Sequence, residues 1–159
     1  MQFKDQRVEE EWAGEGTILA PDGSGRPIVI SSTLRLVLES FEAYTVAVSD
    51  WEPLITCLLR TPEENDQLYG GQGDHMDGVH VEGRAADIRT FDVAKDRVAE
   101  AVAWLNSRWV YDTLRPGMRV GLIEGCGPGS NAPHLHVQVS TRTIQIVPPP
   151  QDDPGVVKY

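Results

Sequence analysis

The order of the predicted helices and strands restricts the folds that are open to this chain. Apolar residues recur every three to four positions over residues 34–48 and 94–109, which predicts two helices, the first capped by Ser31 or Ser32 and the second by Asp92. Short apolar runs predict strands over residues 54–59, 85–89, 118–123, 134–139 and 143–147, the last two as a hairpin. This order lacks the regular βαβ alternation of a doubly wound sheet. We therefore expect an α+β fold, with a mostly antiparallel sheet backed by two main helices.

The segments between these elements are short or rich in glycine. Residues 1–16 are expected to form a short helix or an N-terminal arm, and residues 17–20 and 27–30 a hairpin or two extended pieces around the turn sequence PDGSGR. Residues 61–78 and 125–133 are predicted to be loops, and the proline-rich tail 148–159 to be extended or disordered. The 159 residues have room for one domain, which we assign to residues 1–147.

Length and charge exclude several classes of protein. A chain of this size buries roughly 68–70% of the surface of its unfolded form, so it does not need a metal merely to fold. The net charge of −10 argues against nucleic acid and anionic membranes as partners. No apolar run approaches the ~20 residues of a membrane helix. The polar N-terminal sequence MQFKDQRVEEEW lacks the apolar core of a secretory signal, which predicts synthesis in the cytoplasm.

The four histidines lie in or beside glycine-rich loops at the ends of predicted strands. His80 and Asp87 are separated by Gly83 and small residues, and a tight turn there would bring one nitrogen and one oxygen donor together, as suits Zn²⁺. An aspartate at such a position is also a common cap or salt-bridge residue. The pair by itself is therefore a weak indication of a metal site.

A second arrangement strengthens this indication. In the sequence PHLHVQV, the period of two in a strand places His134 and His136 on one face. Together with His80 and Asp87 they supply three metal ligands and one spare histidine, which is the composition of a catalytic zinc site with an open fourth position. The two cysteines, Cys57 and Cys126, match no CxxC motif and are expected to be a buried small residue and a loop residue; a disulfide between them stays open.

The pattern H-x-x-G-x-A-x-D followed by H-x-H resembles the zinc D-Ala-D-Ala carboxypeptidases and the related L-Ala-D-Glu peptidase endolysins of phages. The resemblance covers residues 54–139, including ITCLLR, GRAADI and HLHVQV. It implies the hedgehog/DD-peptidase fold, one Zn²⁺ per chain held by His80, Asp87 and His136, and His134 as the catalytic residue. It also implies that Arg60 lies near the substrate carbonyl or carboxylate.

One departure is that Gly78 stands where these relatives usually have serine, which we expect to affect the ligand loop or substrate contacts and not zinc binding. The residues also leave other interpretations open. Arg60 could instead form a surface ion pair with Glu63 or Glu64, His75 is expected in a solvated loop, and Glu124 is a candidate partner near the site.

The resemblance predicts a zinc peptidase that hydrolyses peptidoglycan stem peptides with a histidine general base. The absence of a signal peptide fits a phage lysin or virion protein that acts on the cell wall after release, with affinity supplied by its groove or by a carrier protein. Two alternatives are a hedgehog-like module that binds zinc without turnover, and a metal-dependent phosphoesterase that uses the same HxH strand.

Overall fold

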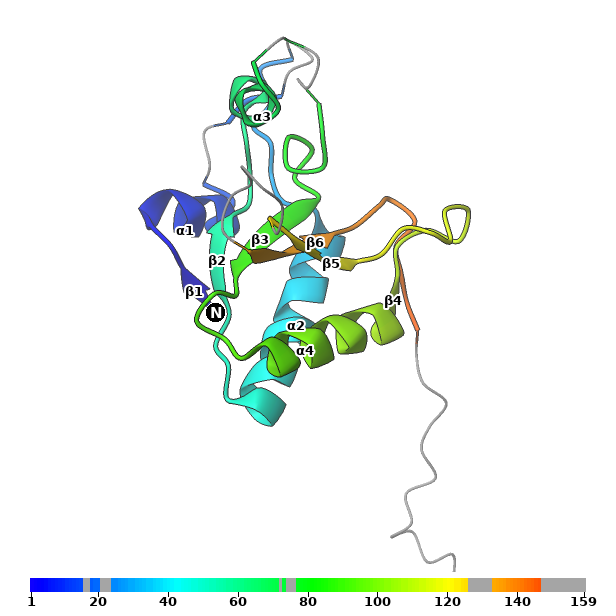
Figure 1. Ribbon diagram of the computed structural model, residues 1–159. Coiled ribbons are helices and arrows are strands. Elements are labelled where there is room, and N and C mark those ends of the chain that lie inside the picture. The colour runs from blue at the N-terminus through cyan, green and yellow to red at the C-terminus, as the bar shows by residue number, and fades with distance from the viewer. Residues whose placement is uncertain (16–17, 21–23, 72, 74–76, 126–132, 147–159) are drawn as a thin grey trace, which may run out of the picture.

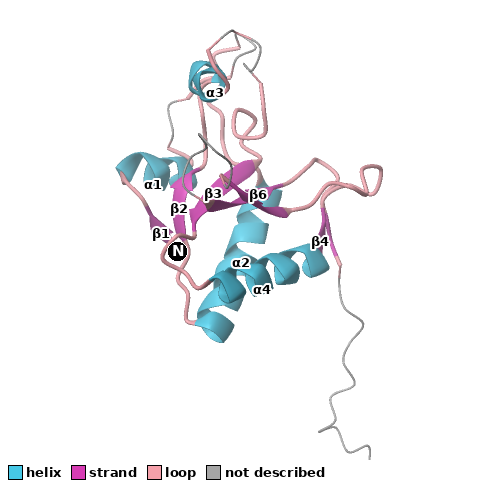
Figure 2. Ribbon diagram, in the orientation of Figure 1, coloured by secondary structure: helices cyan, strands magenta, loops and turns pink. Residues whose placement is uncertain are grey.

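The computed structural model describes residues 1–15, 18–20, 24–71, 73, 77–125 and 133–146. Five strands form its main sheet in the order β1 (Gln2–Phe3), β2 (Leu54–Cys57), β3 (Ala85–Arg89), β6 (His134–Gln138) and β5 (Gly121–Glu124). β1 pairs with β2 in parallel, and the other neighbours are antiparallel. The expected α+β class and the mostly antiparallel sheet are confirmed (Figures 1 and 2).

Two long helices, α2 (Ser32–Ser49) and α4 (Lys95–Arg108), lie against one face of this sheet (Figure 1). α2 begins where predicted, because the Ser31 hydroxyl accepts a hydrogen bond from the Leu34 amide at 3.0 Å. Its end is set by Asp50, whose backbone is left-handed at φ 48°. The start of α4 differs from the prediction: Ala94 is its N-cap, and the Asp92 carboxylate binds Arg89 at 2.9 Å instead.

The core lies between these helices and the sheet. Leu34 and Phe41 of α2 are fully buried together with Ile55, Ile88 and Leu135, one from each of the three central strands. Side chains alternate between the faces of a strand, so the neighbours of these core residues point to the other face. The sheet thus presents one apolar face to the helices and one face on which polar side chains can gather.

The N-terminal segment belongs to the fold. Asp5 caps α1 (Gln6–Ala13), the short helix that the sequence predicted, and β1 joins the sheet beside β2. Glu11 of α1 is buried, where its carboxylate accepts hydrogen bonds from Arg7 at 2.9 Å and from the Leu59 amide at 3.1 Å. These contacts fix α1 against the chain that leaves β2.

The predicted loop over residues 61–78 is wrong in its first part, because it contains the helix α3 (Pro62–Leu68). Thr61 and Glu64 form a capping box, and Pro62 occupies the first helical turn. The signal TPEE was therefore present in the sequence, but the polar composition and the glycines that follow concealed it.

Among the described residues, no helix is long and apolar enough to cross a membrane.

The predicted hairpin of residues 134–139 and 143–147 is also wrong. Both edges of β6 are occupied, by β3 on one side and by β5 on the other. β7 (Ile144–Gln145) instead pairs with β4 (Trp109–Val110), directly after α4. Of the two arrangements expected around PDGSGR, the antiparallel bridge between Leu19 and Pro27 supports the hairpin. The tail 148–159 and most of the predicted loop 125–133 lie outside the described residues.

Candidate metal centre

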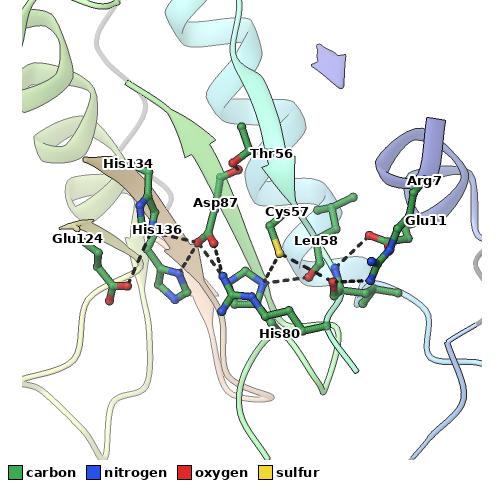
Figure 3. Close-up of polar contacts among 12 residues, drawn as sticks. Arg7, Glu11, Thr56, Cys57, Leu58, His80, Asp87, Glu124, His134 and His136 are labelled. Atoms are coloured by element: carbon green, nitrogen blue, oxygen red, sulfur yellow. Dashed lines mark hydrogen bonds and ion pairs between the residues drawn. The ribbon is translucent and has the colours of Figure 1, made fainter. Parts of the chain in front are cut away.

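The site is built on a row of side chains that crosses three adjacent strands. In the register of the sheet, Asp87 of β3 lies opposite Cys57 of β2 on one side and opposite His136 of β6 on the other. Ile88 and Leu135, which alternate with Asp87 and His136, face the core. Asp87 and His136 therefore share the face that points away from the helices (Figure 3).

His80 reaches this row from a tight turn that precedes β3. The Gly83 amide donates to the His80 carbonyl at 3.2 Å, and the Arg84 amide donates to the Val79 carbonyl at 2.7 Å. Gly83 has a φ of +67°, and a Cβ on it would lie 2.4 Å from the Val29 carbonyl oxygen. Only glycine fits this position, so the turn that the sequence predicted between His80 and Asp87 is confirmed.

Two imidazoles converge on one oxygen of the Asp87 carboxylate. His80 Nε2 lies 3.1 Å from Oδ1, and His136 Nδ1 lies 2.8 Å from the same atom (Figure 3). The ring centroids of the two histidines are 5.1 Å apart. The three residues that the sequence nominated as metal ligands are thus brought together, and all three are buried.

The hydrogen bonds of His80 determine what can lie between it and Asp87. His80 Nδ1 is 3.0 Å from the Leu58 carbonyl oxygen, which can only accept, so Nδ1 carries a proton. In neutral His80, Nε2 then presents a lone pair to the carboxylate oxygen of Asp87. Two such acceptors 3.1 Å apart attract a proton or a metal ion between them.

Asp87 is also held by Arg60, whose guanidinium lies 2.5 Å from the other carboxylate oxygen, Oδ2. Burial alone raises the pKa of the Asp87 carboxyl, but hydrogen bonds with His136 and His80 and the charge of Arg60 hold that pKa well below its usual range. Asp87 therefore stays ionised. Arg60 forms this ion pair and not one with its neighbour Glu64, which is bound by Arg7 at 2.8 Å.

His134 lies at the outer edge of the cluster. Its Nε2 atom is 3.6 Å from Asp87 Oδ1 and 3.9 Å from the carboxylate of Glu124, which is opposite His134 in the β5–β6 register. The His134 side chain is 18% exposed against 6% for His136. The two histidines of HLHVQV thus share a face but differ in access to solvent.

Cys57 is the residue that sequence reasoning missed. It carries a free thiol, and one donor atom from each of Cys57, His80 and Asp87 lies within 4.8 Å of the other two, so this buried cluster could hold a metal ion. Without a metal, burial raises the pKa of the thiol to about 11. The sequence placed Cys57 in a strand, but no local signal indicated which face it would occupy.

The spacing of the donors suits a small cation. With metal–ligand bonds of about 2.0–2.3 Å, the donors of a tetrahedral site lie about 3.3–3.6 Å apart. The His80–Asp87 and His136–Asp87 separations of 3.1 and 2.8 Å are slightly shorter than this. Each histidine thus has one nitrogen at a separation from Asp87 that a metal site would allow after a small outward shift, while the described residues whose donors all lie within 4.8 Å of one another are Cys57, His80 and Asp87.

The helix α3 supports the loop that carries His80. Asn65 of α3 is buried, and its side-chain amide donates to the Asp77 carbonyl at 2.6 Å. A Cβ at the next residue, Gly78, would lie 3.2 Å from the Asn65 amide nitrogen. The expectation that Gly78 affects the ligand loop is consistent with this contact, because the Asn65 side chain occupies the space beside it.

A cavity of about 460 Å³ adjoins the cluster and includes Cys57 and Arg60 in its wall. Glu11 of α1 and Gln67 of α3 complete the wall, together with Lys4 just before α1. Among the described residues, the Lys4 ammonium forms no ion pair. The cavity wall thus holds three cationic groups, Lys4, Arg7 and Arg60, together with the carboxylates of Asp5, Glu11 and Glu64.

The remaining candidates lie apart from this cluster. Glu82 is exposed and binds Arg84, while His75 and Cys126 lie outside the described residues.

Comparisons with protein-family models, with curated proteins and with solved structures found no significant match to this chain.

Proposed function

We propose that this protein is a zinc-dependent peptidase of the hedgehog/DD-peptidase type that hydrolyses peptide bonds in peptidoglycan stem peptides. The observation that carries the proposal is the convergence of His80 and His136 on one oxygen of Asp87, with His134 beside them. The α+β sheet with its polar face supports the same conclusion, because the resemblance in sequence implies such a fold.

The donor set favours zinc over other common metals. His80, Asp87 and His136 would supply two imidazole nitrogens and one carboxylate oxygen, whereas Ca²⁺ and Mg²⁺ prefer sites made of oxygen alone. When bound, zinc would lower the pKa of a water ligand to about 7 and polarise the scissile carbonyl. The hydrogen bond from His80 Nδ1 to the Leu58 carbonyl would keep Nε2 unprotonated and directed at the metal.

His134 is assigned the proton transfers. It lies beside Asp87 without being as deeply buried as His136, so it can reach both the cluster and solvent. As a neutral imidazole it would accept a proton from the attacking water and donate it to the leaving amine. The nearby carboxylate of Glu124 would stabilise the imidazolium formed in between.

Arg60 is assigned the binding of a carbonyl or carboxylate group of the substrate. Its guanidinium is half-buried against Asp87 and lines the cavity, so it offers further N–H donors to a peptide carbonyl or carboxylate. Stem peptides carry free carboxylates, and the Lys4 ammonium in the same cavity, unlike Arg7, forms no ion pair among the described residues. A wall-degrading role also fits the proposed phage lysin or virion protein, delivered to the wall by release or by a carrier.

The test is hydrolysis of defined muropeptides, with the fragments identified by mass spectrometry. We expect cleavage by the zinc-loaded protein, loss of cleavage with a chelator and recovery on adding zinc. His136→Ala should abolish cleavage. Glu82→Gln is the matched control, because Glu82 lies two residues from His80 but is exposed, and this variant should cleave normally.

The same assay separates the alternatives. A protein that binds one zinc per chain but leaves every muropeptide intact would refute the peptidase proposal in favour of a metal-binding module without turnover. Hydrolysis of a phosphodiester substrate in place of the muropeptides would identify a metal-dependent phosphoesterase instead.

A further inference from the structure

A second cavity, of about 450 Å³, lies at the far end of β6 from His134. The strand runs from His134 to Gln138, and the turn that follows it, residues 140–142, forms part of the cavity wall. Four residues of extended chain separate Ser140 from His136, which is about 13 Å along the strand. This cavity shares no residue with the one beside Arg60, so it is a separate feature of the surface.

Three arginines from three different segments line this cavity. Arg84 comes just before β3, Arg115 lies between β4 and β5, and Arg142 follows β6. The last two segments lie side by side (Figure 1, yellow and orange), and the Ser140 hydroxyl donates a hydrogen bond to the Tyr111 carbonyl at 2.7 Å. The fold therefore brings together guanidinium groups that are far apart in the sequence.

Arg84 is already engaged by its neighbours. Its Nε donates to the Glu82 carboxylate at 2.7 Å, and another of its N–H groups donates to the Val139 carbonyl at 2.7 Å. Arg84 thus joins the start of β3 to the end of β6. Its charge is balanced by Glu82, and its main effect is to hold the wall of the cavity in place.

The other two arginines have no such partner. Among the described residues, neither Arg115 nor Arg142 forms an ion pair, and both are exposed. The second carboxylate in the wall belongs to Asp112, which is buried and accepts a hydrogen bond from the Leu114 amide at 2.8 Å. Three arginines against two carboxylates leave an excess of positive charge in this cavity, although the whole chain carries a net charge of −10.

The arrangement of the arginines favours a phosphate group as the ligand. A carboxylate has two oxygens in one plane, which a single bidentate guanidinium can satisfy. A phosphate has oxygens on several sides and can accept hydrogen bonds from more than one arginine at once. Because Arg84, Arg115 and Arg142 reach the cavity from three segments, they suit the second shape better than the first. The volume of the cavity is also in the range of small-molecule sites.

We propose that this cavity is a phosphate-binding site, in which Arg115 and Arg142 bind the phosphate and Arg84 holds the wall of the site in place. The ligand class is a phosphate ester, either a small molecule or a phosphodiester unit of a polymer. The inference does not depend on the metal centre or on the proposed peptidase function, because none of these residues belongs to that site.

The experiment measures binding of inorganic phosphate, of poly(glycerol phosphate) and of acetate to the full-length protein by isothermal titration calorimetry at low salt. The test variant carries Arg115→Gln and Arg142→Gln. The control variant carries Arg26→Gln and Lys95→Gln, which removes the same charge from exposed residues outside the cavity. Circular dichroism verifies that both variants are folded. We expect the test variant to bind phosphate groups about tenfold more weakly or worse, and the control variant to bind within about twofold of the unmodified protein.

The ligands and variants separate the possible outcomes. Binding of free phosphate alone would assign the site to small phosphate esters, and additional or tighter binding of the polymer would make it an attachment site for a phosphate polymer. Equal weakening in the test and control variants would show that only overall charge matters, which overturns the proposal. Binding that survives in the test variant would place the phosphate elsewhere, for instance on a metal. Acetate bound as tightly as phosphate, or no binding of any phosphate ligand to the unmodified protein, would also refute the assignment.

Discussion

Replacement of Gly83 by alanine should destabilise the protein strongly, and the structure supplies a matched control for the effect. Gly83 and Gly25 both have a φ of +67°, but an added Cβ meets the Val29 carbonyl oxygen at 2.4 Å only at Gly83, and meets nothing within 4 Å at Gly25. Both variants therefore carry the cost of a left-handed alanine, roughly 1–2 kcal/mol. Only Gly83→Ala adds a collision, between the new Cβ and the backbone of Val29.

The size of that collision can be worked out from its contacts. Ordinary van der Waals contact begins at 3.4 Å, so the backbone must move by about an ångström, which typically costs about 1–3 kcal/mol. The movement also strains the hydrogen bond from the Ser31 amide to the Gly83 carbonyl, 2.8 Å long, which contributes about 1 kcal/mol. We expect a loss in the free energy of unfolding of about 3–6 kcal/mol for Gly83→Ala and about 1–2 kcal/mol for Gly25→Ala.

Urea unfolding of the two variants and the unmodified protein, followed by circular dichroism at constant m-value, measures these losses. Gly83→Ala should also weaken zinc binding, since the turn positions His80, and Gly25→Ala should leave zinc binding unchanged. Two variants that lose stability equally, to within about 0.5 kcal/mol, would refute the close approach of Val29 on which the reasoning depends.

Four further predictions concern the site and the ion pair beside it. Metal analysis should find about one zinc per chain. Zinc and activity should fall together in acid, because an imidazole nitrogen that carries a proton cannot bind the metal; full activity at roughly pH 4 would contradict this. His134→Ala should keep zinc but lose about 10²–10⁴-fold in turnover, and His134→Glu should recover part of that loss. His136→Ala should lose zinc. If His134→Ala loses zinc and His136→Ala keeps it, the roles of the two histidines are exchanged. Asp87→Ala should lose zinc yet keep its circular dichroism spectrum, and a collapse of that spectrum would make the site structural. Hydrogen bonds with Arg7 lower the pKa of Glu64 from 4.5 to about 2, so the stabilising effect of ionised Glu64 is present above pH 4.5 and is lost as the pH falls towards 2. The difference in urea midpoint between the unmodified protein and Glu64→Gln should therefore become smaller over that range. A difference that stays constant would show that the ion pair with Arg7 is not its cause.

Features that depend only on neighbouring residues along the chain could be predicted from the sequence. The apolar spacing of three to four predicted α2, and the hydroxyl of Ser31 marked its start. The alternation in HLHVQV placed His134 and His136 on one face, and the spacing of His80, Gly83 and Asp87 predicted a turn that the structure contains. Such features follow from the chain's own periods and turn chemistry, so they need no knowledge of distant neighbours.

The tertiary structure alone decided which distant residues complete the site. The shift of register between Ile55 and Cys57 exists only in the pairing of β2 with β3, and it turns the thiol from the core to the polar face. Arg60 forms its ion pair with Asp87 and not with the glutamates nearest to it in sequence, because the sheet brings the end of β2 beside β3. β7 paired with β4 because β6 already had partners on both edges. In each case several partners were available to the same residue or strand, and the packing of the whole domain determines which of them lies close enough to bind.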